Sequence, residues 1–121
     1  MFEIEVELSF SSAHYLRGYK GKCESLHGHN WRVKATVSGK ELNKEGLLLD
    51  FKELKERLRN VLEELDHKNL NEISYFKKVN PTSENIAKFI FDKLKREIIK
   101  GKLKKITVWE SDNSSASYYE E

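Results

Sequence analysis

Cysteine, proline and methionine are scarce in this chain, which contains one of each in 121 residues. A single cysteine cannot form a disulfide within the chain, so a disulfide-stabilised secreted scaffold is excluded. Residues 2–7 carry a glutamate at every second position, which argues against a signal peptide, and no apolar run is long enough to span a membrane. We therefore expect a soluble cytoplasmic protein with no membrane partner.

The chain also lacks a strong excess of charge and any sign of an internal boundary. Its formal net charge is +2, too small to indicate a nucleic-acid partner by itself. The densest basic stretch, residues 93–105, is interleaved with leucine and isoleucine at helical spacing, which is typical of a solvated helix face. No linker, repeat or low-complexity tract divides the sequence, so we expect one domain over residues 1–121.

Alternation of apolar and polar residues predicts four strands. Phe2 to Phe10 alternates strictly with period two, and His14 keeps the parity of the apolar face. Residues 29–38 alternate in the same way, and His27 and His29 share the parity of their apolar side chains. Residues 103–110 and 115–120 are predicted to be the third and fourth strands.

Two amphipathic helices are predicted between these pairs of strands. Asp50 is a suitable N-cap, with Glu53 completing a capping box, and an apolar stripe follows from residue 51 to residue 65. Thr82 or Ser83 caps the second helix, whose stripe extends to residue 98 before Gly101 ends it. The order β-β-α-α-β-β predicts an α+β protein, an antiparallel sheet with two helices on one face. Because such a small sheet has free edges, we expect a homo-oligomer.

Three of the four histidines lie on inward positions of the first two strands: His14, His27 and His29. Neutral imidazole is a good zinc ligand, and three histidines leave a coordination position open for water or substrate. Cys23 lies four residues before His27. Three roles are open for this residue. It could be a small buried apolar side chain, a thiolate that acts as base or nucleophile beside the metal, or a fourth metal ligand that would close the site.

Two acidic positions complete the candidate chemistry. Asp66 and His67 are adjacent in a polar turn after the first helix, where they are a solvated helix end or a pair that transfers protons. Glu110 shares the parity of Ile106 and Val108, so the alternation carries a carboxylate toward the buried face. It is either an edge residue at the end of the sheet or the partner of a ligand with N–H donors.

These residues occur in motifs that resemble those of the 6-pyruvoyl-tetrahydropterin synthase family, and more narrowly its 6-carboxy-tetrahydropterin synthase branch of queuosine biosynthesis. The motifs run in order from Phe2 to Tyr119 and are F-S-S-A-H (10–14), C-x-x-x-H-G-H-N (23–30), L-D-F-x-x-L-K (49–55), L-D-H-x-x-L-N (65–71), N-P-T-S-E-N (80–85) and Glu110. The joint occurrence of the motifs is specific, although H-G-H alone would be weak.

The resemblance implies the tunnelling fold, assembled as trimers or as hexamers of two trimers, with the active site between subunits. It implies a pterin substrate, 7,8-dihydroneopterin triphosphate, and a Zn2+ ion held by His14, His27 and His29. By the same resemblance, Cys23 is the thiolate base, and Asp66 with His67 is a second proton-transfer unit contributed by a neighbouring subunit. Pterin binding is assigned to Glu110 and to the helix start, Thr82, Ser83 and Glu84.

Alternative functions remain at this point. The pyruvoyl branch shares the zinc ligands and the Cys-Asp-His set but releases only triphosphate, whereas the carboxy branch also releases acetaldehyde. The compact length and the uninterrupted spacing from Cys23 to His29 favour the carboxy branch. A cupin-like metal enzyme is disfavoured by the two amphipathic helices. A non-catalytic zinc- or pterin-binding module would use Cys23 as a fourth ligand.

Overall fold

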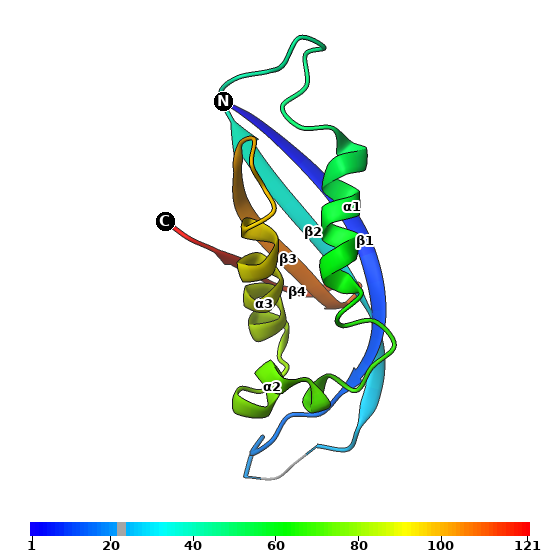
Figure 1. Cartoon of the computed structure of the whole chain (residues 1–121). Coiled ribbons are helices and arrows are strands. Elements are labelled where there is room, and N and C mark those ends of the chain that lie inside the picture. Colours follow the sequence, from blue (N-terminus) through cyan, green and yellow to red (C-terminus); the bar gives the residue numbers. More distant parts are fainter. Residues whose placement is uncertain (22–23) are drawn as a thin grey trace.

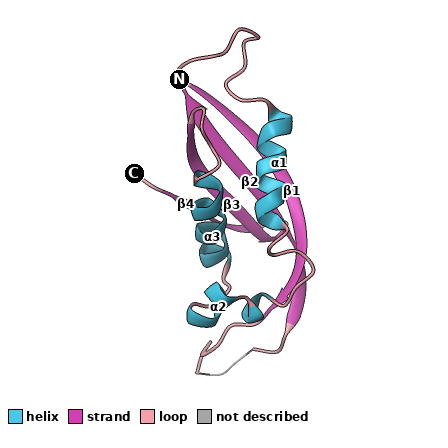
Figure 2. Cartoon of the chain, viewed as in Figure 1, coloured by secondary structure: helices cyan, strands magenta, loops and turns pink. Residues whose placement is uncertain are grey.

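A four-stranded antiparallel sheet in the order β1-β2-β3-β4 runs along the protein in the computed structural model, which describes residues 1–21 and 24–121 (Figure 1). The strands are β1 (Phe2–His14), β2 (His27–Gly39), β3 (Lys102–Ser111) and β4 (Ser114–Tyr119). The helices are α1 (Phe51–Leu62), α2 (Ser74–Lys78) and α3 (Ser83–Lys95), with a short 3-10 turn, η1, at Leu70–Glu72. The long helices α1 and α3 cover one face of the sheet (Figure 2), as the sequence predicts for an α+β protein.

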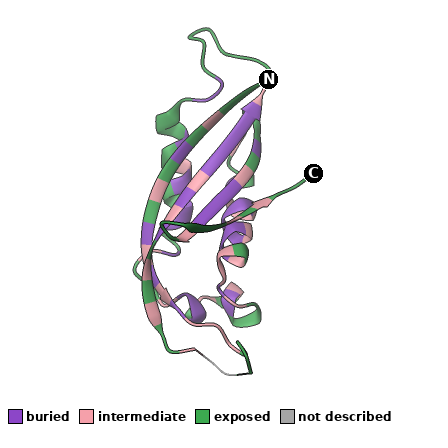
Figure 3. Ribbon diagram, turned by 180° about the vertical axis from the view of Figure 1, so that it is seen from behind, coloured by how far each residue is buried: buried purple, intermediate pink, exposed green. Residues whose placement is uncertain are grey.

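The predicted alternation places the apolar side chains of the strands under these helices. Buried and exposed residues alternate along β1 (Figure 3). On β2 the inward side chains from Trp31 to Val37 are all fully buried. They belong to the same hydrophobic core as the apolar side of α1, where Leu54 and Leu58 are also fully buried. Burial of each such leucine contributes roughly 1.5–3 kcal/mol, so the core is what holds the helices on the sheet.

Both predicted cap residues are present, although at Asp50 the bond comes from Lys52 rather than from Glu53, the residue that a capping box would use. The Asp50 side chain accepts a hydrogen bond from the Lys52 backbone N–H at the start of α1. Thr82, rather than Ser83, is the cap of α3, since its hydroxyl accepts from the Asn85 backbone N–H at 3.1 Å. These bonds satisfy amide groups that have no partner inside the helix. The start of α3 is therefore fixed at a defined residue.

The helix ends differ from the sequence prediction. α1 ends at Leu62 and Leu65 lies in the following turn, although its side chain is fully buried. α3 ends at Lys95, and Ile98 packs against the core from the connection to β3. Phe51 was predicted to be on the apolar stripe but is 53% exposed. The apolar spacing therefore predicts that Leu65 and Ile98 face the core, but it does not show that they lie in the segments that follow the helices.

The segment between α1 and α3 also contains structure that the sequence did not predict. The turn η1 and the five-residue helix α2 lie there, anchored by the fully buried side chains of Leu70 and Phe76. The same segment covers the end of the free edge of β1, because the Ala13 N–H donates to the Lys68 carbonyl at 2.9 Å. In the part of the chain that the structure describes, no helix is both long and apolar enough to cross a membrane.

Candidate metal centre

The antiparallel pairing of β1 and β2 brings the three inward histidines together. His14 lies directly opposite His27, and His29 lies opposite Ser12, one position along the same face. The ring centroid of His14 lies 4.7 Å from that of His27 and 5.1 Å from that of His29. One ring nitrogen from each histidine lies within 4.8 Å of the others, as a shared metal ion requires. The three histidines could therefore hold a metal ion, as the sequence predicts.

Hydrogen bonds to backbone carbonyls orient two of these rings. His14 Nδ1 lies 2.7 Å from the carbonyl oxygen of Pro81, and His27 Nδ1 lies 2.8 Å from that of Ser25. A carbonyl oxygen can only accept, so each Nδ1 carries the proton and donates it. The Nε2 lone pair of each ring is then available to a metal, which is the usual arrangement around metal-binding histidines.

Among residues 1–21 and 24–121, two ring nitrogens of this cluster are buried and have no hydrogen-bond partner: Nε2 of His14 and Nε2 of His29. A buried polar atom without a partner costs about 1–3 kcal/mol, so each such atom calls for a ligand. Burial also lowers the pKa of His14, which favours the neutral ring. Neutral imidazole is the form that binds a metal, so the donor set fits Zn2+.

Trp31 supports the cluster from the adjoining inward position of β2. Its side chain is fully buried, and its ring centroid lies 4.8 Å from that of His14 and 5.1 Å from that of His29. Its indole N–H donates to the Ser12 carbonyl at 3.1 Å. Trp31 therefore holds two candidate ligands in place. Its parity with His27 and His29 was visible in the sequence, whereas the Pro81 carbonyl had no sequence signal.

Asp66 and His67 form a close pair on the edge of β1, outside the three-histidine cluster. His67 Nδ1 lies 2.9 Å from the Asp66 carboxylate, and the His67 side chain is 81% exposed. The Ser11 N–H donates to Asp66 Oδ1 at 2.8 Å, and the His67 N–H donates to the Ser11 carbonyl. The Ser11 hydrogen bond is the main cause that lowers the pKa of Asp66, with His67 adding to it.

Glu110 reaches the cluster from the end of β3. Its carboxylate lies 3.6 Å from His29 Nε2, and its side chain is 41% exposed. The inward parity was therefore a correct guide, but the carboxylate sits at the margin of the core rather than within it. This position combines a negative charge near the histidines with access for a ligand from outside.

The start of α3 approaches the cluster through Pro81. The residue that bonds to His14 directly precedes Thr82, whose hydroxyl caps the helix. Ser83 is half-buried and Glu84 is exposed. Cys23, the predicted base, lies outside the described residues.

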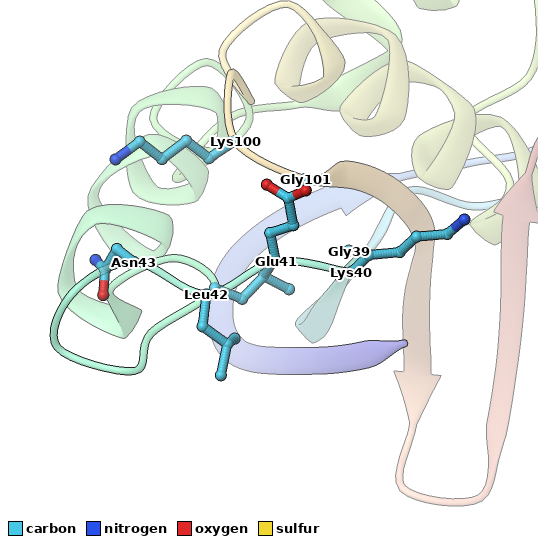
Figure 4. A pocket seen from close by; sticks show the side chains of 8 residues that line it. Gly39, Lys40, Glu41, Leu42, Asn43, Lys100 and Gly101 are labelled. Atoms are coloured by element: carbon cyan, nitrogen blue, oxygen red, sulfur yellow. The ribbon is translucent and has the colours of Figure 1, made fainter.

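A surface pocket of about 500 Å³ lies at the far end of β2 from the histidines (Figure 4). Its lining includes Gly39, at the end of β2, and Gly101, before β3, together with Lys40 and Lys100. None of the candidate site residues lines it. The clustered imidazoles, rather than this pocket, therefore identify the candidate site.

An antiparallel sheet covered by two helices on one face, with three histidines at one end of its first two strands, defines an α+β protein whose clustered imidazoles could hold a metal ion. The model of the 6-pyruvoyl tetrahydropterin synthase family matches residues 3–121, and the chain belongs to this family. This confirms the resemblance carried by the motifs.

Individual relatives agree with this assignment. The chain is 32% identical to the 6-carboxy-5,6,7,8-tetrahydropterin synthase of Haemophilus influenzae, over 99% of this chain and 100% of that protein. It is 33% identical to the human 6-pyruvoyl tetrahydrobiopterin synthase, over 96% of this chain and 90% of that protein. The solved structure of Caenorhabditis elegans 6-pyruvoyl tetrahydropterin synthase superimposes with a TM-score of 0.87 at 30% identity, covering 99% of this chain and 96% of that one. The tunnelling fold is thereby confirmed.

Proposed function

We propose that the protein is a zinc-dependent 6-carboxy-5,6,7,8-tetrahydropterin synthase of the queuosine pathway, acting in the cytoplasm. It would convert 7,8-dihydroneopterin triphosphate and one water molecule into 6-carboxytetrahydropterin, acetaldehyde and triphosphate, the water supplying the second oxygen of the new carboxyl group. The observation that carries the proposal is the cluster of three imidazoles, in which two buried Nε2 atoms have no hydrogen-bond partner among the residues that the structure describes. Overall identity does not separate the branches, since the two relatives above are 32% and 33% identical. The compact length and the uninterrupted Cys23-to-His29 spacing support the carboxy branch.

In this proposal His14, His27 and His29 hold the zinc ion. Bound zinc supplies Lewis-acid chemistry, polarising the hydroxyl groups of the substrate side chain so that the adjacent carbons lose protons more easily. The Pro81 and Ser25 carbonyls keep two of the imidazoles in the tautomer that binds metal. Trp31 supports two of the rings from the side of the core.

Proton transfer is assigned to Cys23 and to the Asp66–His67 pair. Cys23 would act as a thiolate that removes and returns protons on the substrate side chain. Asp66, kept ionised by its bond from Ser11, would orient the imidazole of His67, whose Nδ1 lies 2.9 Å from the carboxylate. His67 is exposed on the edge of β1, where it would serve the site of a neighbouring copy in a trimer or hexamer.

Substrate binding is assigned to Glu110 and to the start of α3. The Glu110 carboxylate would accept hydrogen bonds from the ring N–H and the exocyclic amine of the pterin. Thr82, Ser83 and Glu84 would line the same pocket, where the first turn of a helix has backbone N–H groups free to donate. The pterin would then lie beside the histidines, a position supported by the distance of 3.6 Å between the Glu110 carboxylate and His29 Nε2.

The product of the zinc-loaded protein with 7,8-dihydroneopterin triphosphate tests the proposal. Mass spectrometry is expected to find 6-carboxytetrahydropterin and equimolar acetaldehyde. A 6-pyruvoyl product without acetaldehyde would assign the protein to the other branch, with the same residues in the same roles. Intact substrate, with one zinc per chain confirmed, would contradict catalysis on this compound and favour a zinc- or pterin-binding module.

Replacing Glu110 by glutamine is expected to raise KM about 10–100-fold, since hydrogen bonds to a charged group contribute roughly 1.5–3 kcal/mol. The glutamine keeps the shape but loses the charge and offers an N–H where the pterin also donates. Steady-state kinetics with metal content measured on each sample checks this. Asp112→Asn, an exposed carboxylate two residues away, is the matched control and should leave KM unchanged. An unchanged KM in Glu110→Gln would exclude Glu110 as the pterin anchor.

A further inference from the structure

Three asparagines lie in the two motifs that follow the first helix, residues 65–71 and 80–85, without a role in the chemistry above: Asn71, Asn80 and Asn85. Two of them clamp the chain directly after His14. The Asn71 side chain accepts from the Tyr15 N–H and donates to the Tyr15 carbonyl, each at 2.9 Å. The Asn80 side chain makes the same pair of bonds with Arg17, also at 2.9 Å each. An asparagine amide carries both a donor and an acceptor, so it can mimic a backbone partner in this way.

Asn80 is fixed on its own backbone as well. Its carbonyl accepts from the Asn85 side chain at 2.9 Å and from the Thr82 N–H at 2.9 Å. Pro81, which lies between these anchored residues, is buried, and its ring restricts the backbone further. Its carbonyl oxygen is the one that accepts from His14 Nδ1.

Asn80 thus connects two segments that both lead to His14. One is the strand end that carries the histidine, held through Arg17, and the other is the turn that supplies the Pro81 carbonyl. The Arg17 guanidinium strengthens the connection by donating to the Val79 carbonyl at 3.0 Å. If the side-chain hydrogen bonds of Asn80 were lost, the Pro81 carbonyl and His14 Nδ1 would no longer be held at their separation of 2.7 Å.

We propose that Asn80, assisted by Asn71, is a positioning residue that pre-forms the metal site by fixing His14 against the Pro81 carbonyl. This inference rests on the proposed metal site. Groups that orient a metal-binding histidine typically contribute 10–100-fold to metal affinity, although they do not touch the metal. Asn80→Ala is therefore expected to weaken zinc binding by about 10–100-fold while the protein remains folded.

The test measures the zinc dissociation constant by competition with a chromophoric chelator, with the folded fraction measured by circular dichroism. Asn43→Ala is the matched control, because the Asn43 side chain also accepts two backbone bonds, from Glu45 and Leu47, in the loop that follows β2. The control should lose thermal stability but keep the zinc affinity of the wild type. The visible spectrum of the Co2+ form should change in Asn80→Ala and not in Asn43→Ala.

Unaltered zinc affinity and an unaltered Co2+ spectrum in folded Asn80→Ala would overturn the inference. If that variant does not fold, Asn71→Ala tests the second clamp with the same readouts and the same deciding outcome. The proposed function is tested separately, by the products that the wild type forms and by zinc binding in His14→Ala. If His14→Ala binds zinc as the wild type does, the metal site itself is wrong and the inference falls with it.

Discussion

Replacing His14 by alanine is expected to abolish stoichiometric zinc binding and, with it, turnover. His14 is the most buried of the three candidate ligands, because it is 2% exposed whereas His27 and His29 are half-buried. Loss of a direct ligand should exceed the roughly 10–100-fold effect of losing a group that only orients one. Metal analysis after gel filtration and an activity assay on the same sample check the prediction.

Two other variants separate ligands from neighbours. His67→Ala removes the remaining histidine, which lies outside the cluster, and should retain one zinc per chain. Cys23→Ala should also retain zinc while losing turnover, because the proposed thiolate acts as a base and not as a ligand. Loss of zinc from Cys23→Ala would instead indicate a closed four-ligand site, which is typical of structural zinc.

Removal of the Asp66–His67 pair is expected to reduce kcat by about 10²–10⁴-fold with zinc content unchanged, the usual contribution of a positioned acid or base. His67→Ala removes the proposed proton-transferring group, and Asp66→Asn removes the carboxylate charge 2.9 Å from His67 Nδ1. Single-turnover kinetics on zinc-loaded samples separates this effect from product release. A His67→Ala variant with wild-type kcat would exclude the pair from the chemistry.

The same variants test whether the pair serves a neighbouring subunit. His14→Ala and His67→Ala are each expected to be inactive alone, and activity should return when the two chains are refolded together. A mixed oligomer would then contain sites with intact ligands from one chain and an intact pair from another. No recovery in oligomers shown to be mixed would mean that each chain uses its own pair.

Asp66 also determines the sign of one contribution to the pH dependence of folding stability. Its pKa is lowered, first by the Ser11 hydrogen bond, so the folded state favours the carboxylate. The resulting stability is present above the ordinary pKa of an aspartate and is lost as pH falls through the lowered value. Asp66→Asn should therefore flatten the acid limb of a thermal-unfolding profile. An acid limb identical to the wild type would show that the Ser11 bond does not contribute.

Much of the candidate site could be predicted because strands impose a period of two. Once Phe10 and Trp31 are assigned to the core face, the parity of His14, His27 and His29 follows, and a shift by one residue would expose the whole apolar set. The caps at Asp50 and Thr82 follow from side chains that can accept from free helix amides. These properties are local, so the residues themselves specify them.

The sequence by itself determined the four strands, the two long helices, the family and the set of inward histidines. Only the tertiary structure decided that His14 faces His27 across the sheet, since register depends on the pairing of two separate strands. It also decided that the Pro81 carbonyl, 67 positions along the chain, holds His14, and that Asn71 and Asn80 clamp the residues after it. Such contacts form only when segments that are distant in the sequence pack on one core, so the spacing of residues along the chain does not predict them.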